Sequence, residues 1–477
     1  MSAGSDFLQL RAEAAPAKGI TTWLVDAVRV AVVDGRLGPG ARLPATRDLA
    51  ADLGVSRGVV VEAYRRLVDE GLAEARTGAG TVVTNRLAPL APPPPGRGPD
   101  GVAFDPAGLR LPLGPGEGIE FDLSPGRPDL AAFPRAAWLR AERAVLTSMT
   151  STDLGYGDPR GTLSLRRELA VWLARTRGTR AEPDDILVVA GVAQALALAA
   201  RVLGARDVAM EDPGSRGARD QITSWGLRPR PVPVDEHGLR VEDLVATGLD
   251  TVLLTPAHQF PTGVVLSPAR RRELLAWGGL VLEDDYDAEH RYDRAPVAAL
   301  QASAPDRVVY MGSTSKTLAP GMRLGWMIPP RATRDDLIAV KHSTDLGNPA
   351  LSQLVLAHLL RSGEYERHLR RVRQRQRRRR DALFAALEQH LPAARVEGVA
   401  AGLHLLITLP GEIPDTVLAE QVAEVGVRVH PLSWHRTAPG RPGLVIGYAA
   451  HPPNRLEEAA RRMGARLGMV VRTDITR

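Results

Sequence analysis

The sequence lacks cysteine, long apolar runs and an apolar N-terminal segment. Because none of its 477 residues is cysteine, disulfide bonds, thiolate zinc sites and a cysteine nucleophile are excluded together. No apolar run reaches the length of a membrane span, and residues 1–20 contain no continuous apolar core of the kind found in signal peptides. We therefore expect a cytoplasmic protein without a membrane partner, in which any nucleophile is another residue type.

Length and charge bound the architecture. A chain of 477 residues is too long for one compact core, so two or three domains are expected. The formal net charge of +6 is compatible with a nucleic-acid partner. Many arginine-rich enzymes share such a charge, so charge alone does not distinguish an enzyme from a DNA-binding protein.

Apolar periodicity predicts three short helices near the N-terminus. In residues 20–33 apolar side chains recur at helical spacing, and the pattern stops where glycines begin. A second helix is expected after Pro44 and a third from the capping residue Ser56 to near Gly71, with Gly54 turning the chain between them. Two helices joined by a short glycine turn predict a helix-turn-helix, whose second helix can enter the DNA major groove.

A hairpin is predicted directly after these helices. Two short strand-like runs in residues 72–83 flank the turn sequence Thr-Gly-Ala-Gly at positions 77–80. Such a hairpin beside a helix-turn-helix forms a wing. Residues 18–86 therefore predict a small winged DNA-binding domain.

The composition then changes twice. Residues 87–118 are rich in proline and glycine, which is typical of an extended, semi-rigid linker. From residue 119 onward strands and helices alternate, which predicts an α/β domain with a largely parallel sheet. We expect strands at residues 186–189, 208–210, 252–255, 280–283, 308–311 and 324–328, with helices such as 194–203 and 268–277 between them.

An arginine-rich stretch lies near the end of this domain. Residues 361–380 include the run RHLRRVRQRQRRRR. A solvated helix face is favoured over a second DNA contact, because charge runs on helices usually face water. We expect a long exposed helix that leads into a small C-terminal subdomain.

The N-terminal motifs carry a family resemblance. Residues 20–86 resemble the winged helix of GntR-type regulators, through the phrases LPATRDLAADLGVSRGVVVEAYRRL and GLAEARTGAGTVV. The resemblance implies that Arg47, Ser56 and Arg57 contact a double-stranded DNA operator, while Gly78 and Gly80 let the wing backbone approach it. Arginine offers paired donors to guanine or phosphate, and a serine hydroxyl can donate to phosphate. Any one of these arginines alone would be an ordinary surface charge, but the order of turn, cap, arginines and wing favours DNA contact.

The rest of the chain resembles the fold type I aminotransferases. The motifs YGDPRG, AGVAQAL, EDPG, HQFPTG, EDDYD and GSTSKTLAPGMRLGW follow one another in the order of that family and span residues 121–450. The whole chain is similar to the MocR subfamily of GntR regulators. The resemblance implies a winged helix-turn-helix followed, in residues 119–477, by an α/β aminotransferase-like domain with a small C-terminal subdomain.

This resemblance also implies a cofactor, pyridoxal 5'-phosphate (PLP). Lys316 would hold the PLP aldehyde as a Schiff base. Asp284 would keep the pyridine nitrogen protonated, and Tyr286 would donate to the 3'-oxygen. The phosphate would be held by hydroxyl groups, a guanidinium and a helix N-terminus, which belong to Gly191, Val192, Ala193, Ser313, Ser315 and Arg323. Tyr156 is implied to reach the phosphate in the other subunit of a homodimer with shared sites, and no metal site is expected.

Two positions depart from the aminotransferase pattern. Ser215 stands where many relatives carry an aromatic residue that stacks on the cofactor ring. Val445 stands where aminotransferases usually carry an arginine for the substrate carboxylate, and Arg441 is close in sequence but not aligned with the motif. PLP binding is still expected, whereas turnover of ordinary α-amino acids is expected to be slow or absent, since the carboxylate lacks its paired cation.

Three functions stay open at this point. The leading one is a DNA-binding regulator that senses a small-molecule effector, either a small amine, an amino acid or PLP itself. The second is a working aminotransferase with a regulatory head, which would need a carboxylate-binding group and a complete catalytic shell. The third is a DNA-binding protein whose C-terminal domain is only a dimerisation scaffold and lacks the cofactor.

Overall fold

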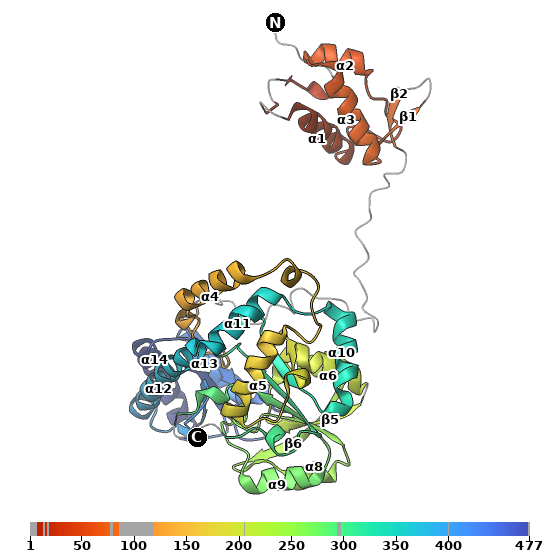
Figure 1. Ribbon diagram of the computed structural model, residues 1–477. Helices are drawn as coiled ribbons and strands as arrows, with labels where there is room; N and C mark the ends of the chain where they lie inside the picture. Colours follow the sequence, from red (N-terminus) through yellow and green to blue (C-terminus); the bar gives the residue numbers. More distant parts are fainter. Residues whose placement is uncertain are drawn as a thin grey trace. The chain divides into compact units, whose positions relative to one another are not determined.

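The computed structural model describes residues 7–12, 15–16, 19–76, 80–84, 118–204, 206–292, 297–398 and 400–475. The chain divides into two compact units, Met1–Leu111 and Pro112–Arg477 (Figure 1). Among the described residues, no helix is both long enough and apolar enough to cross a membrane.

The first unit contains the three predicted helices. They are α1 (Ile20–Val33), α2 (Thr46–Leu53) and α3 (Arg57–Asp69). Each helix buries one apolar stripe, and the stripes pack into a single core. The inward-facing side chains of this core include Leu24, Val25, Val28, Leu49, Leu53, Val60, Ala63, Tyr64 and Leu67.

The turn between α2 and α3 has the predicted glycine geometry. Gly54 adopts the left-handed conformation at φ 63° and ends α2. Ser56 occupies the N-cap position of α3, but its side chain accepts no hydrogen bond from the helix backbone. The expected capping bond is therefore absent, and the exposed hydroxyl of Ser56 stays available to a ligand. The turn is tied to the core by Tyr64, whose hydroxyl donates to the Pro44 carbonyl at 3.0 Å.

The predicted wing is a two-stranded antiparallel hairpin. Strand β1 (Ala73–Arg76) pairs with β2 (Gly80–Val83), in a register that joins Arg76 to Gly80. The residues of the turn itself, which include Gly78, lie outside the described residues.

The second unit is built on a mixed sheet of eight strands. Its order is β4-β11-β10-β9-β8-β5-β6-β7. The inner strands from β10 to β6 run parallel, whereas β11 is antiparallel to both β10 and β4, and β7 is antiparallel to β6. The strands are β4 (Leu187–Val189), β5 (Asp207–Asp212), β6 (Arg228–Asp235), β7 (Gly238–Leu239), β8 (Thr251–Leu254), β9 (Leu280–Asp285), β10 (Val308–Ser313) and β11 (Gly325–Ile328).

All six predicted strands are present, but β6 and β7 were not predicted. The sequence of β6, RPRPVPVD, places prolines at alternate positions, and proline argues against a central strand. The structure accommodates them because β6 lies near the edge of the sheet, with only Val234 and Asp235 paired to β7.

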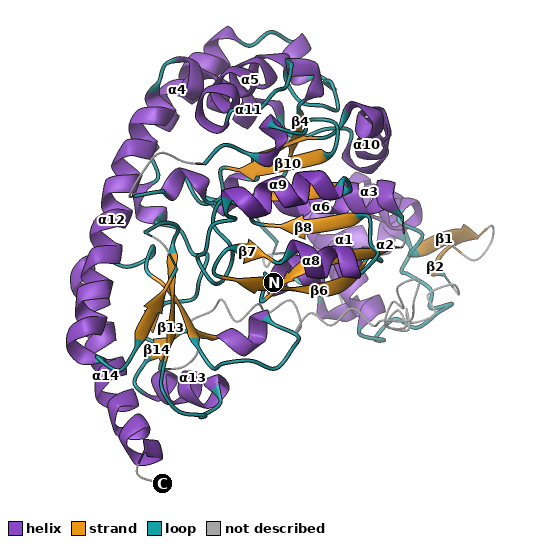
Figure 2. Cartoon of the chain, turned by 90° about the horizontal axis from the view of Figure 1, so that it is seen from below, coloured by secondary structure: helices purple, strands orange, loops and turns teal. Residues whose placement is uncertain are grey.

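Helices cover both faces of this sheet (Figures 1 and 2). Alternate strand residues face α6, α7 and α10 on one side, and α5, α8, α9 and α11 on the other. The helices around the sheet are α4 (Arg135–Ser148), α5 (Leu163–Arg177), α6 (Val192–Leu203), α7 (Arg216–Ser224), α8 (Val241–Ala246), α9 (Pro268–Trp277), α10 (Arg331–Asp345) and α11 (Ala350–Arg361). Short 3-10 turns occur in both units. In the first unit one lies at Phe7–Gln9, and in the second unit they lie at Leu130–Ala132, Thr152–Leu154, Pro183–Asp185, Ala288–His290, Leu300–Ala302, Pro320–Met322 and Leu432–His435.

The expected small C-terminal subdomain is a four-stranded sheet with its own core. Its strand order is β12-β13-β16-β15, and a separate short pair joins β3 to β14. The elements are β3 (Phe121–Asp122), α12 (Glu364–His390), β12 (Arg395–Glu397), β13 (His404–Thr408), α13 (Asp415–Glu424), β14 (Val427–Arg428), β15 (His430–Pro431), β16 (Leu444–Gly447) and α14 (Pro453–Ile475).

The arginine-rich helix α12 is not a fully exposed element. It runs along one edge of the unit beside α14 (Figure 2) and buries a face that includes Tyr365, Leu369 and Leu383. Arg379 is 5% exposed, and its guanidinium donates to the Ala449 carbonyl and lies 2.8 Å from Asp129. The expectation of a solvated helix was therefore wrong for this face, because an arginine with a buried acceptor and a counter-ion can lie inside the protein.

A buried ion pair joins α5 to the end of β9. The guanidinium of Arg177 donates to Asp285 at 2.6 and 2.9 Å, and both side chains are at most 2% exposed. The hydroxyl of Tyr310 on β10 donates to the same carboxylate at 2.6 Å. Burial is the largest effect and opposes the charged guanidinium, but the surrounding acidic groups, Asp285 foremost, together raise the pKa of Arg177.

We expect Asp285→Asn to lower the free energy of unfolding by about 3 kcal/mol, because it leaves the buried Arg177 charge without its counter-ion. The control is Glu168→Gln, which breaks a pair with Arg361, a side chain that is 62% exposed. This control should cost less than about 1 kcal/mol. Urea unfolding followed by circular dichroism measures both, and equal losses would contradict a special role for the buried pair.

Candidate functional site

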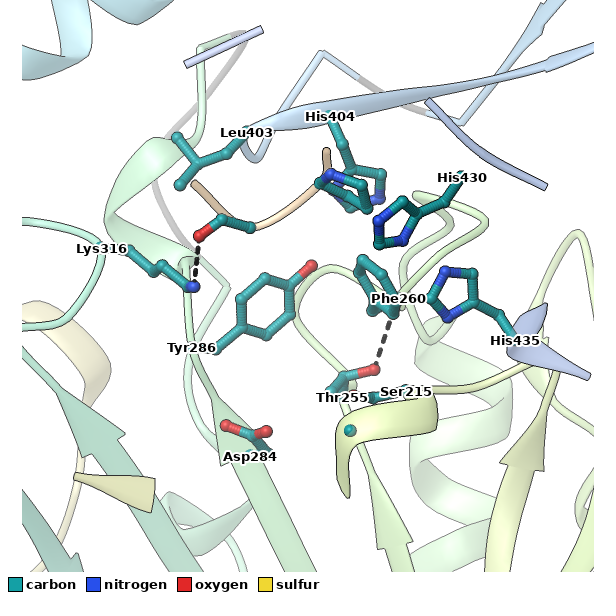
Figure 3. Close-up of a pocket in the computed structure, with 13 residues that line it drawn as sticks. Ser215, Thr255, Phe260, Asp284, Tyr286, Lys316, Leu403, His404, His430 and His435 are labelled. Carbon is teal, nitrogen blue, oxygen red and sulfur yellow. Dashed lines mark hydrogen bonds between the residues drawn. The ribbon is translucent and has the colours of Figure 1, made fainter. Parts of the chain in front are cut away.

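A cavity of about 310 Å³ lies where the sheet of the second unit meets its C-terminal subdomain. Figure 3 shows side chains from both parts that point toward it. The cavity is lined by Pro125, Gly126, Ser215, Gly217, Thr255, Phe260, Asp284, Tyr286, Lys316, Leu403, His404, His430 and His435. Like other sites in α/β proteins, it lies beyond the carboxyl ends of parallel strands.

Three residues that the sequence singled out converge on this cavity. Asp284 is the second-last residue of strand β9, Tyr286 follows that strand, and Lys316 follows β10. The Nζ atom of Lys316 donates to the Gly126 carbonyl at 2.5 Å (Figure 3). Burial lowers the pKa of the Lys316 amine, and the carboxylates of Asp287 and Asp284 oppose this shift only in part.

Asp284 faces the cavity with unused hydrogen-bonding capacity. Its Oδ1 atom is buried and has no hydrogen-bond partner among the described residues. Burial, together with the neighbouring carboxylates of Asp285 and Asp287, raises the pKa of Asp284 to about 7, and Lys316 opposes this shift only in part. A cationic or hydrogen-bond-donating ligand placed here would stabilise the ionised carboxylate.

Tyr286 is held by a hydrogen-bonded chain. The Nδ1 atom of His258 lies 3.1 Å from the Tyr286 hydroxyl and 2.8 Å from Oδ2 of Asp287. Burial is the largest effect and opposes ionisation of Asp287, but the surrounding histidines, His258 foremost, together lower the pKa of this carboxyl. Gly402 makes room for the imidazole of His258: it adopts φ 73°, and a Cβ there would come within 2.0 Å of the ring.

His404 completes a compact polar group with His258 and Asp287. Ligand atoms of these three residues lie within 4.8 Å of one another, a spacing that a metal ion could use. Hydrogen bonds already account for the group, because His258 is bonded to Asp287 and the Nε2 atom of His404 lies 3.1 Å from the Pro261 carbonyl. We assign these residues to positioning Tyr286 and the cavity wall rather than to metal binding.

The residues predicted to hold a phosphate lie on three neighbouring segments. Gly191, Val192 and Ala193 form the N-terminal end of α6, Ser313 ends β10, and Arg323 precedes β11. A Cβ at Gly191, where φ is 92°, would lie 3.5 Å from the Arg323 guanidinium. The backbone amide of Ser315 donates to the Ser313 hydroxyl at 3.3 Å. The Arg323 guanidinium and the N-terminal end of α6 are thus adjacent, and the two serines are joined to each other.

Tyr156 does not border this cavity. It lies in the loop after the turn at Thr152–Leu154, and its side chain is 93% exposed. The single chain therefore offers the Tyr156 hydroxyl to solvent or to another molecule.

The two departures from the aminotransferase pattern have different environments. Ser215 lines the cavity and caps α7, because its hydroxyl accepts from the Ala218 amide at 3.2 Å. Val445 is fully buried between Leu406 and Leu432 in the subdomain core, so its side chain does not border the cavity. Neither position supplies a cation.

Sequence reasoning missed the histidines of the cavity wall. His404 begins β13, and His430 and His435 lie on β15 and the following 3-10 turn. The spacing of the two histidines in HPLSWH was the only signal in the sequence. This spacing does not predict a site by itself, because the histidines border a cavity only when the subdomain packs against the sheet.

The residues predicted to contact DNA lie on the exposed surface of the first unit. Arg47 is in the first turn of α2, and Arg57 begins α3 directly after Ser56. The Nε atom of Arg57 donates to the Thr46 hydroxyl at 3.4 Å, which links the starts of the two helices. In the wing, Gly80 adopts φ 80° and is exposed, while Gly78 lies outside the described residues.

Two protein families match the two parts of the chain. The bacterial regulatory proteins of the gntR family match residues 22–83, and aminotransferase class I and II matches residues 119–463. The probable rhizopine catabolism regulatory protein MocR of Rhizobium meliloti is 32% identical over 453 residues, which cover 91% of each chain. The pyridoxine biosynthesis transcriptional regulator PdxR of Corynebacterium glutamicum is 34% identical over 448 residues, which cover 92% of this chain and 93% of that one.

A solved aminotransferase structure is similar to the second unit. The α-aminoadipate aminotransferase LysN of Thermus thermophilus, in complex with N-(5'-phosphopyridoxyl)-L-leucine, has a TM-score of 0.69 and 26% identity, and the match covers 78% of this chain and 98% of that one. Together with the fold, these similarities confirm the predicted family. The chain belongs to the MocR-type GntR transcription regulators, in which a GntR helix-turn-helix domain is joined to a domain with the fold type I aminotransferase architecture.

Proposed function

We propose that this regulator binds PLP at Lys316 and changes its affinity for a DNA operator when a small-molecule effector enters the same cavity. The effector is a small amine, an amino acid or PLP itself. The observation that carries the proposal is the convergence of Lys316, Asp284 and Tyr286 on one cavity. A simple dimerisation scaffold gains nothing from these groups, because an unpartnered buried carboxyl oxygen such as that of Asp284 lowers stability.

The residues present suit both ends of PLP, and those proposed for the phosphate lie outside the lining of the cavity itself. The Asp284 carboxyl suits a ring nitrogen, because a protonated ring would provide the partner that its Oδ1 atom lacks among the described residues. The adjacent Gly191 and Arg323 suit a phosphate, because the helix N-terminus and the guanidinium both favour an anion. When bound, PLP supplies an aldehyde that an amine can capture and a ring that withdraws electrons.

The residues of this chain would hold the cofactor and set its protonation. Lys316 would hold the aldehyde, since a lowered pKa favours the neutral, nucleophilic amine. Asp284 would keep a proton at the ring nitrogen, and the Tyr286 hydroxyl, fixed by His258, would donate to the 3'-oxygen. Ser313, Ser315, Arg323 and the amides of residues 191–193 would bind the phosphate.

The chain has few lysines that could compete with Lys316. The other two are Lys18, which lies outside the described residues, and Lys341. The Nζ atom of Lys341 lies 3.0 Å from Asp345 and donates to Asn348 at 2.7 Å. Its amine is therefore engaged in the structure of α10 and the loop after it.

The exposed Tyr156 supports a homodimer with shared sites. A tyrosine that is 93% exposed has no function within its own chain that the structure explains. In the proposed dimer its hydroxyl reaches the phosphate held by the partner subunit, so that each cofactor site is complete only in the dimer.

The cavity favours sensing over turnover. Ser215 offers no stacking face to the ring, and Lys316 is the only lysine or arginine among the described lining residues. A regulator does not require fast chemistry, because an effector that binds one domain arrangement more tightly than another shifts the population toward it.

DNA binding is proposed for the exposed starts of α2 and α3. Arg47, Ser56 and Arg57 lie together there, and the exposed Gly80 lets the wing backbone approach the same duplex. Both arginines can pair with guanine or phosphate, and the Ser56 hydroxyl can donate to phosphate because it is exposed.

We expect Lys316→Ala to abolish the visible absorbance of the PLP-loaded protein while operator binding by the first unit remains measurable, because Lys316 lies in the other unit. Lys341→Arg is the matched control and should keep the absorbance. Borohydride reduction followed by peptide mass spectrometry identifies the modified lysine. A PLP adduct on Lys18 or Lys341 in the wild-type protein would show that Lys316 is the wrong residue.

We expect Arg57→Ala to weaken binding to an operator selected with the wild-type protein by about 1–3 kcal/mol, with the cofactor absorbance unchanged. If Arg57 contacts phosphate, the salt dependence of binding should also become shallower. The control is Arg65→Ala on the same helix, because Arg65 is already paired with Glu62 and Asp69. Fluorescence anisotropy measures both variants, and an equal effect of the two substitutions would remove Arg57 from the interface.

A further inference from the structure

The cavity wall on the side of Tyr286 away from Lys316 carries imidazoles with unused hydrogen-bonding atoms (Figure 3). Neither ring nitrogen of His435 has a hydrogen-bond partner among the described residues, and the same holds for Nδ1 of His430. His404 differs, because its Nε2 atom lies 3.1 Å from the Pro261 carbonyl. Unpartnered buried nitrogens lower stability, so a ligand that satisfies them gains affinity.

The rings are held in place by their neighbours. His435 is only 5% exposed, and its ring stacks on that of His430 with 5.6 Å between centroids. Phe260 meets His435 edge-on at 5.0 Å, and Trp434 lies 5.2 Å from His430. The unpartnered nitrogens therefore have fixed positions in side chains that line the cavity, which reduces the entropy lost when a ligand binds.

The charges around these histidines are mainly positive. Burial lowers the pKa of His430 to about 4 and that of His435 to about 3, so both rings are neutral near pH 7. Nearby arginines act in the same direction as burial at both rings, and the Asp122 carboxylate opposes it at His430. The groups that face His435 are His430, His404, Arg219 and Arg216, and those that face His430 are Asp122, Arg428 and Arg216.

We propose that His430 and His435 bind the anionic head group of the effector, a carboxylate or a chemically similar acid. The inference rests on the proposed function, because it assigns a binding role within the effector cavity. An anion here would accept hydrogen bonds from imidazole N–H groups in a positive environment. It would take the place of the pairing that an arginine provides in aminotransferases and that Val445 cannot provide.

The proposal has a pH signature with a definite sign. An anion stabilises the protonated imidazole and raises its pKa in the complex, so the complex binds more protons than the free protein. Affinity for an anion should therefore rise as the pH falls. A neutral ligand of the same shape should show no such dependence.

The test uses equilibrium dialysis of radiolabelled butyrate and butyramide with the full-length, PLP-loaded protein. Butyrate stays ionised between about pH 6 and pH 8, and neither probe carries an amine that reacts with the cofactor. We expect butyrate to bind more tightly than butyramide, and the rise in butyrate affinity to be confined to the acidic end of this range, because the free rings are neutral near pH 7. His435→Gln should weaken butyrate binding about tenfold or more, since charge-assisted hydrogen bonds are lost.

Matched variants separate the histidines from other anion sites. His237→Gln replaces an exposed histidine beyond β6 and should leave butyrate binding unchanged. His430→Gln gives a second, independent measurement if His435→Gln fails to fold, which near-ultraviolet circular dichroism detects. Equal binding of the two probes, unchanged butyrate affinity in a folded histidine variant, or loss of binding only in Arg216→Gln would each overturn the proposal.

The outcome is distinguishable from a failure of the proposed function. Visible absorbance reports PLP loading before the probes are added. A protein that loads PLP but binds butyrate independently of the histidines contradicts only the assignment of the head-group site. A protein that does not load PLP contradicts the proposed function, and the same dialysis with the unloaded chain still tests the two histidines.

Discussion

Four carboxyl groups lie within the five residues 283–287, at the end of β9, and much of the second unit is arranged to stabilise them. Ionised carboxylates cannot be removed from water without partners. Glu283 accepts from the backbone amides of Leu300 and Gln301 at 2.9 and 3.2 Å. Asp285 is paired with Arg177, and Asp287 with His258. Each of these partners comes from a different segment, so this one strand end fixes the positions of several loops and helices.

Asp284 differs from the other three carboxyl groups, because one of its oxygens has no hydrogen-bond partner among the described residues. Its neighbours 283, 285 and 287 all have partners, whereas its Oδ1 atom has none among the described residues and faces the cavity. Burial, with the surrounding carboxylates, raises the pKa of Asp284 to about 7, so its charge near neutral pH depends on what enters the cavity. The same electrostatic arrangement thus stabilises the fold and prepares one carboxyl for a ligand.

The cavity joins two structural layers with different tasks. The sheet contributes Lys316, Asp284 and Tyr286, which are fixed by regular strands and their hydrogen-bonded neighbours. The C-terminal subdomain contributes Leu403 and the three histidines. A shift of the subdomain relative to the sheet would therefore change the effector end of the cavity and leave the cofactor end intact. Such a division suits the proposed function, in which an effector binds while the proposed cofactor stays in place.

The sequence by itself determined the order of the elements, the winged helix and the six predicted strands. These features follow from local patterns of apolar periodicity and glycine turns. The shared site of Lys316, Asp284 and Tyr286 was implied by the family resemblance. Only the tertiary structure decided that Arg379 is buried, that the proline-rich β6 joins the sheet, and that His404, His430 and His435 border the cavity. These outcomes depend on contacts between residues far apart in the chain, such as Phe260 with His435 at 5.0 Å. No local pattern encodes such contacts, because burial and charge environment arise only when separate elements pack together.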